Sequence, residues 1–206
     1  MITSDYIMEA LDEILPNAKC ELNYNKDYEL LIATVLSAQA TDKSVNKVTE
    51  ILFKKYNLED LSKIDIKLIE DIIHSVGTYQ RKSFYVQEIA KSLIKNYNGI
   101  VPNNREYLES LPGVGRKTAN VVLANLFNEP TIAVDTHVGR VSKRLGIANI
   151  DDDVYTIEKK LMKKFPKNKW NKLHHQLVLF GRYTCKSQKP ECENCPFKST
   201  CKSKKL

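Results

Sequence analysis

The sequence predicts an all-α protein. Segments with apolar residues at helical spacing follow one another along the 206 residues, and none alternates like a strand of a sheet. Glycine and proline are scarce, with seven of each, which suits long helices better than many short strands. Hydrophobic residues make up 42% of the chain and charged residues 28%, so the chain is expected to fold around a substantial core.

Six helices are expected before residue 100, each from its own apolar spacing and end signals. Residues 28–36 are apolar almost all round, which is typical of a fully buried helix. The expected ranges are 4–15 with Ser4 as N-cap, 28–36, 42–56 capped by Thr41 or Asp42, a short helix from 58, 65–75, and 81–97 ended by Asn98 and Gly99.

The second half continues in the same way. A short helix at 104–110 is followed by a glycine-containing turn and an apolar helix to residue 127. Residues 128–130 break the chain, and 131–134 form a brief apolar crossing segment. Three more helices are expected: one after Asp135 to about 146, one from about 153 to 165, and one at 170–183.

The turn between the two central helices carries the motif LPGVGRKTA at residues 111–119. Gly113 and Gly115 allow a sharp turn, which would expose consecutive backbone N–H groups around Val114 at the start of a helix. A helix N-terminus binds anions readily, and no glycine side chain would block an approaching phosphate. The motif is similar to the hairpin of a helix-hairpin-helix element, although a plain turn between helices has the same glycine spacing.

The charge and hydropathy of the chain indicate what kind of partner it binds and where in the cell it is expected. The formal net charge is +7, which favours a polyanionic partner. The chain shows no signal-peptide pattern and no apolar run of transmembrane length, so a cytoplasmic protein is expected.

Four of the five cysteines lie in the last 22 residues, with the spacing Cys-x6-Cys-x2-Cys-x5-Cys: Cys185, Cys192, Cys195 and Cys201. Intracellular proteins rarely use cysteines for disulfides, so the cluster indicates a metal or iron–sulfur site. Four thiolates suit one tetrahedral zinc ion or one cubane iron–sulfur cluster, and spacing alone leaves both open. Lys186 and Lys189 lie in the same loop and would present positive charge to DNA, or else are ordinary solvated lysines.

Two residues are candidates for catalysis. Lys117 lies in the first turn after the glycine hairpin, where the positive helix end and partial burial would lower the pKa of its amine and free the lone pair for attack. Most lysines in such a chain are solvated surface charges. Asp135 precedes THVGRV and is expected to cap that helix, whether or not it also stabilises a developing cation.

Three segments together resemble the endonuclease III family of helix-hairpin-helix DNA glycosylases: 111–122, TIAVDTH at 131–137, and the cysteine tail. LSAQATD at 36–42 is similar to an early motif of that family. The resemblance implies an all-α fold of two helical domains flanking a DNA-binding groove, with residues 20–129 as a six-helix domain and 1–19 plus 130–206 as a second domain around a [4Fe-4S] cluster on the four cysteines.

The same resemblance implies the activity. Lys117 would attack the sugar of a flipped, damaged pyrimidine in duplex DNA, form a Schiff base and cleave the abasic site by β-elimination, with Asp135 as the essential carboxylate. The hairpin residues Gly113, Val114 and Gly115 would hold DNA, and Gln39 would fill the vacated space in the duplex. The protein would be a prokaryotic, nucleoid-associated monomer.

Two positions depart from the family pattern. Thr78 stands where a leucine wedge is common, and Gly139 stands where a bulky apolar residue is usual. Other hypotheses are a sister glycosylase with another lesion or mismatch specificity, a non-catalytic iron–sulfur DNA-binding protein, and a zinc-stapled structural module. Only an enzyme gives Lys117 and Asp135 a shared role.

Overall fold

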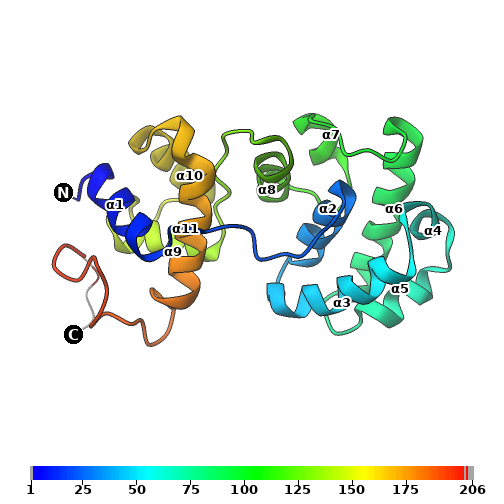
Figure 1. The fold of residues 1–206 in the computed structure, drawn as a ribbon, viewed down its shortest axis with the longest axis horizontal. Coiled ribbons are helices and arrows are strands. Elements are labelled where there is room, and N and C mark those ends of the chain that lie inside the picture. The colour runs from blue at the N-terminus through cyan, green and yellow to red at the C-terminus, as the bar shows by residue number, and fades with distance from the viewer. Residues whose placement is uncertain (1, 202, 204–206) are drawn as a thin grey trace. The chain divides into compact units, whose positions relative to one another are not determined.

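A computed structural model describes residues 2–201 and 203 of the chain. Within these residues the fold is all-helical, with eleven α-helices, one 3₁₀ turn and no strand, as the sequence predicts (Figure 1). The helices are α1 (Ser4–Ile14), α2 (Asp27–Leu36), α3 (Asp42–Lys55), α4 (Leu58–Lys63), α5 (Ile66–Ile73), α6 (Tyr79–Tyr97), α7 (Arg105–Ser110), α8 (Arg116–Phe127), α9 (Thr136–Arg144), α10 (Val154–Lys164) and α11 (Trp170–Tyr183), with η1 at Lys167–Lys169.

By its internal contacts the chain divides into two compact units. Unit 2 is Glu21–Phe127 and holds α2 to α8. Unit 1 combines Met1–Cys20 with Asn128–Leu206 and holds α1 and α9 to α11.

In unit 2, α2 lies among the other helices. Its residues from Tyr28 to Leu36 are all buried, as expected for a helix that is apolar on every side. Helices α3, α6 and α8 pack against α2, while α4 and α5 pack against α6. Polar side chains cap several of these helices: Asn57 caps α4, Asp65 caps α5 and Asn104 caps α7.

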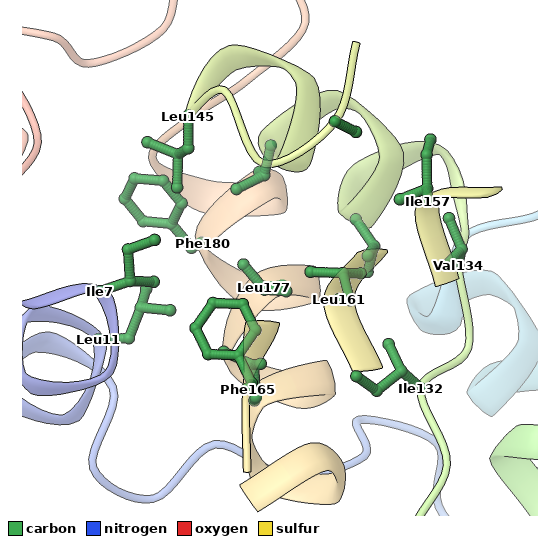
Figure 2. Close-up of a cluster of buried hydrophobic side chains, with 14 of the residues drawn as sticks. Ile7, Leu11, Ile132, Val134, Leu145, Ile157, Leu161, Phe165, Leu177 and Phe180 are labelled. Carbon is green, nitrogen blue, oxygen red and sulfur yellow. The ribbon is translucent and has the colours of Figure 1, made fainter. Parts of the chain in front are cut away.

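Unit 1 has one apolar core, to which α1, α9, α10 and α11 all contribute (Figure 2). Ile7 and Leu11 of α1 meet Leu177 and Phe180 of α11 in this core. The crossing segment 131–134 is fully buried and adds Ile132 and Val134. This core fixes α9 and α11, the two helices beside the cysteine loop.

The helix ends lie within about two residues of the expected ones, and two of the differences have a clear physical reason. Thr3, and not Ser4, is the N-cap of α1, because the Thr3 hydroxyl accepts the N–H of Tyr6 at 3.3 Å while Ser4 already lies inside the helix. Helix α6 begins at Tyr79, two residues earlier than expected, because Thr78 before it has a left-handed backbone with φ of +57°. Both differences are at termini, where local hydrogen bonds decide the boundary.

Candidate functional site

The hairpin of unit 2 connects α7 to α8 through residues 111–115. Leu111 and Val114 are 4% and 5% exposed, so the turn is anchored by two side chains that point into the unit. The N–H of Val114 donates to the carbonyl of Leu111 at 3.1 Å. The expectation of consecutive free N–H groups is therefore wrong at Val114, because the turn uses that group to close itself. The N–H groups of Gly113 and Gly115 have no hydrogen-bond partner among the described residues.

The two glycines of the hairpin differ in their surroundings. Gly113 has φ of +78°, and a Cβ there would lie 2.5 Å from the ring of Tyr85 and 3.1 Å from Val35. Its missing side chain is thus required by the fold, and not only by an approaching phosphate. Gly115 has ordinary φ, and a Cβ there would meet nothing within 4 Å. Of the pair, Gly115 is the one that opens onto free space.

A polar contact fixes the two helices of the hairpin to each other. Arg105 of α7 donates from Nη2 to Oδ1 of Asn120 in α8 at 2.8 Å, and from Nη1 to Glu109 at 3.1 Å. Asn120 is 1% exposed, so its side chain is held inside the unit. This contact ties α8 directly to α7 across the turn, and the sequence analysis did not predict it.

Lys117 lies in the first turn of α8, next to Arg116, and that turn carries no acidic residue. Its side chain is exposed, so the expectation of partial burial is wrong. The reason is the helical period: Val114, Thr118 and Ala119 face the interior, which turns Lys117 outward. The ammonium has no hydrogen-bond or ion-pair partner in the described part of the chain.

Asp135 belongs to unit 1 and is the N-cap of α9, which confirms its predicted structural role. Its Oδ1 accepts the N–H of Val138 at 2.8 Å, and its carbonyl accepts the N–H of Gly139 at 2.9 Å. The buried residues Ile132 to Val134 precede it and fix its backbone. The carboxylate is held at one oxygen and is half-buried.

Gln39 and Thr78 occupy the tips of two turns in unit 2. Gln39 lies between α2 and α3, and Thr78 immediately precedes α6. Both side chains are exposed, and both backbones are left-handed, with φ of +54° and +57°. A β-branched residue such as threonine is rare in this conformation.

The four clustered cysteines line one hollow of unit 1, together with side chains of α9 and α11. Arg144 of α9 donates from Nη1 to Sγ of Cys185 at 3.3 Å and to the carbonyl of Lys186 at 2.7 Å. Phe197, which is fully buried, packs edge-on against Phe180 and holds the turn between Cys195 and Cys201. The cluster predicted from spacing therefore converges on a single place: Cys185, Cys192, Cys195 and Cys201.

The chemistry of this hollow suits a soft metal group. Burial raises the pKa of the Cys195 thiol, and the neighbouring thiols raise it further. A bound cation reverses that effect, because thiolate ligands are deprotonated by the metal. Among the residues described, no three His, Cys, Asp or Glu side chains form a group that could hold a single metal ion. The donor set of four thiols around one hollow fits a metal–sulfur group.

The two loop lysines differ in their contacts. Lys186 forms an ion pair with Glu191 of the same loop at 2.6 Å, which offsets its charge. Lys189 is exposed and has no partner within the described residues. Of the two, only Lys189 carries an uncompensated charge on this loop.

Comparisons with known proteins identify the family to which the chain belongs. Residues 32–167 match the model of the HhH-GPD superfamily base excision DNA repair proteins. Endonuclease III of Bacillus subtilis is 47% identical over 199 residues, which cover 96% of this chain and 91% of the relative. Endonuclease III of Escherichia coli K12 is 43% identical, covering 96% and 94%.

Solved structures agree with the sequence relatives. A non-covalent endonuclease III–DNA complex superposes with a TM-score of 0.93 at 49% identity and covers 98% of this chain and 97% of the other. A trapped endonuclease III–DNA covalent intermediate has a TM-score of 0.92 at 49% identity, with the same coverage. A thermostable thymine-DNA glycosylase shares the fold, with a TM-score of 0.85 at 24% identity.

The fold, the hairpin and the family match together define a base excision DNA repair protein of the helix-hairpin-helix class. Within that class the chain belongs to the endonuclease III family. It is a DNA glycosylase with lyase activity, and the non-enzymatic hypotheses are not favoured. In the described part of the chain, no helix has the length and apolarity needed to cross a membrane.

Proposed function

We propose that this chain excises oxidised or otherwise damaged pyrimidines from duplex DNA and cuts the resulting abasic site with Lys117 as the nucleophile. The observation that carries the assignment is the position of Lys117: exposed, free of any partner among the described residues, and one residue into the helix that follows the hairpin. An amine in an internal ion pair would have to break that pair first. This one is ready to react once it loses its proton.

The proposed reaction has two stages, removal of the base and cleavage of the strand. The unprotonated Lys117 amine attacks C1′ of the sugar, the C1′–N bond to the base breaks, and the base leaves with the electron pair and takes up a proton. The nitrogen then loses a proton, its lone pair forms the C1′=N bond as the C1′–O4′ bond breaks, and O4′ takes up a proton, which leaves the opened sugar as an imine, the Schiff base. Loss of a C2′ proton breaks the C3′–O bond, which cuts the strand, and hydrolysis of the imine frees Lys117.

Asp135 is assigned the stabilisation of positive charge that builds on the sugar during base loss. Its cap hydrogen bond fixes one carboxylate oxygen and leaves the other for the substrate. A charge that is positioned before the reaction needs no reorganisation in the transition state.

The hairpin holds the DNA by its phosphate backbone. The turns of Gln39 and Thr78 hold it at the position that the damaged base leaves. The free N–H groups of Gly113 and Gly115, followed by Arg116 and Lys117, form a cationic helix start that suits a phosphate. Gln39 and Thr78 are the residues that enter the duplex when the damaged nucleotide leaves it. Lys189 adds positive charge from the cysteine loop.

The four cysteines are assigned to a [4Fe-4S] cluster. Their convergence on one hollow and the soft thiolate donor set support this choice, as does the family relationship. The cluster would tie the loop to α9 and α11 and supply one-electron chemistry. We expect about four iron atoms for each chain and broad visible absorption; one zinc ion in a colourless protein would contradict the assignment.

The protein is placed in the cytoplasm, at the nucleoid, as a monomer. The bacterial relatives and the DNA substrate support this placement. Light scattering of the free protein and of its DNA complex would measure the oligomeric state, and a stable dimer in both would contradict the monomer.

The nucleophile is tested by trapping. The protein is mixed with a duplex containing one oxidised pyrimidine, and borohydride is added to reduce the imine to a permanent bond. We expect a covalent protein–DNA adduct with the wild type and none with Lys117→Gln. The control variant, Lys91→Gln, removes the charge of an exposed lysine of α6 that pairs with Glu88, so it should still form the adduct. An adduct with Lys117→Gln would refute the nucleophile.

Asp135 is tested with Asp135→Asn. Asparagine caps helices about as well as aspartate, so the midpoint of thermal unfolding should stay within about 2 °C, while base excision falls by orders of magnitude. Binding to the damaged duplex should persist. A variant that unfolds early, or that excises normally, would leave Asp135 as a cap only.

A further inference from the structure

Lys82 is a buried cation in the interior of unit 2. Its side chain is 3% exposed and lies on the same face of α6 as Val86, Ile89 and Leu93. No carboxylate pairs with it among the described residues. Lysine is almost never fully buried without a partner, because desolvation disfavours its charge. The same desolvation lowers the pKa of Lys82.

The hydrogen bonds of Lys82 connect two turns that are distant in sequence. Its Nζ donates to the carbonyl of Ala38 at 2.7 Å, a contact across 44 residues. Its backbone N–H donates to the carbonyl of Thr78 at 3.0 Å. The second bond is the ordinary backbone bond of the first turn of α6, and only the first comes from the side chain. Ala38 directly precedes Gln39, so the Lys82 side chain ties the turn of Gln39 to the start of α6, which Thr78 immediately precedes.

Both turns store backbone strain at the residue that points outward. Gln39 and Thr78 are left-handed, which costs about 1–2 kcal/mol for an ordinary L-residue. Such conformations persist only where the surroundings enforce them. The remaining contacts of these turns are local: Ala40 N–H donates to Ser37 at 3.1 Å, and the Thr78 hydroxyl donates to Gly77 at 2.7 Å. Lys82 supplies the long-range contact.

The end of α2 explains why a lysine is tolerated there. Helix α2 ends at Leu36, and the Ala38 carbonyl lies just beyond its C-terminus. The unsatisfied carbonyls of a helix C-terminus attract a cation. The ammonium is therefore placed where its desolvation is partly offset, and where its removal would release the turn of Gln39.

We propose that Lys82 is a positioning residue, which locks the turn of Gln39 to the turn of Thr78 so that both side chains stand ready to enter the duplex. The inference rests on the proposed function, which assigns these two side chains to the vacated base position. It predicts that Lys82 acts on opening of the base pair and not on the chemistry at Lys117. The substitution of choice is Lys82→Met, which keeps the length and removes the donor.

The first readout separates base extrusion from chemistry. Single-turnover excision is measured on a lesion paired in a duplex and on the same lesion left unpaired in a bulge. Extruding an unpaired base costs less, so Lys82→Met should slow the paired substrate about tenfold or more and the bulged one by at most about twofold. Lys91→Met is the matched control, because Lys91 is an exposed lysine of the same helix paired with Glu88, and it should change neither rate.

The second readout is a double-mutant cycle with Gln39→Ala. If Lys82 acts through the turn of Gln39, the variant that carries both substitutions should be no slower than Gln39→Ala alone. Lys82→Arg keeps the cation and its donors and should recover most of the rate on the paired lesion. Lys82→Gln enters the same cycle as a second, shorter and polar variant.

Stability distinguishes positioning from a structural role. Replacing a buried, unpaired cation with an apolar side chain of similar length should leave the unfolding midpoint unchanged or higher, because Ala38 is exposed and its carbonyl can bind water. Equal slowing on both substrates, additive losses in the cycle, or a large drop in the midpoint would each overturn the proposal. Borohydride trapping of the wild type on a single-stranded abasic site tests Lys117 separately, so failure there is distinct from failure at Lys82.

Discussion

Gly113 and Gly115 lack side chains for different physical reasons, although the sequence presents them as a symmetrical pair around Val114. Gly113 combines a left-handed backbone with a Cβ position 2.5 Å from Tyr85, so any side chain there meets the interior. Gly115 has neither constraint. Gly113 is therefore needed to form the turn, whereas Gly115 leaves the outer surface of the hairpin open.

This difference gives a paired prediction. Gly113→Ala should lower the free energy of unfolding by about 2–4 kcal/mol, the sum of left-handed strain and overpacking. Gly115→Ala should change it by less than about 1 kcal/mol, yet weaken binding to duplex DNA severalfold, because a methyl group then stands beside the free N–H groups. Thermal denaturation measures the change in stability, and DNA binding at one fixed salt concentration measures the change in affinity. Equal destabilisation by the two substitutions would contradict the distinction.

At the scale of elements, helices α9 and α11 pack closely because Gly181 lets them approach. A Cβ at Gly181 would lie 2.9 Å from the Cβ of His137, 3.1 Å from Val141 and 3.2 Å from the His137 carbonyl, which is backbone. Arg140 of α9 strengthens the contact by donating to the Gly181 carbonyl at 2.7 Å. The second glycine, Gly139 of α9, has only ordinary contacts at 3.8 Å from Ile157 and 3.9 Å from Val134.

Replacing Gly139 or Gly181 with alanine should therefore change the free energy of unfolding in opposite directions. Gly139→Ala should raise the free energy of unfolding by about 0.5–1 kcal/mol, because glycine inside a helix costs conformational entropy and the methyl group fits. Gly181→Ala should lower it by about 1–3 kcal/mol, since the backbone of α9 cannot move aside cheaply. Chemical denaturation of the two variants beside the wild type measures both. Destabilisation by Gly139→Ala would mean that the space beside Ile157 is already filled.

At the scale of the whole molecule, local signals in the sequence predicted most helices, because caps and apolar spacing act within a few residues. Asp135 is an example: its cap was expected from the residue itself and is confirmed. The prediction that Lys117 is partly buried is wrong, because its exposure depends on which face of α8 turns inward. Lys82 was missed as a functional candidate because its partner, Ala38, is 44 residues away. The one available signal was its place on the apolar face of α6, four residues before Val86.

The division into two units predicts that the cores unfold with some independence. Leu177 of unit 1 and Leu93 of unit 2 are both fully buried, so replacing either with alanine should cost about 2–5 kcal/mol. Hydrogen exchange of the purified protein shows which helices lose protection. Leu177→Ala should speed exchange in α1, α9 and α11 while α2 and α6 keep their protection, and Leu93→Ala should do the reverse, since each unit has its own apolar core. Equal acceleration across both units by either variant would show one cooperative core, because a helix exchanges faster only when the unit that buries it opens.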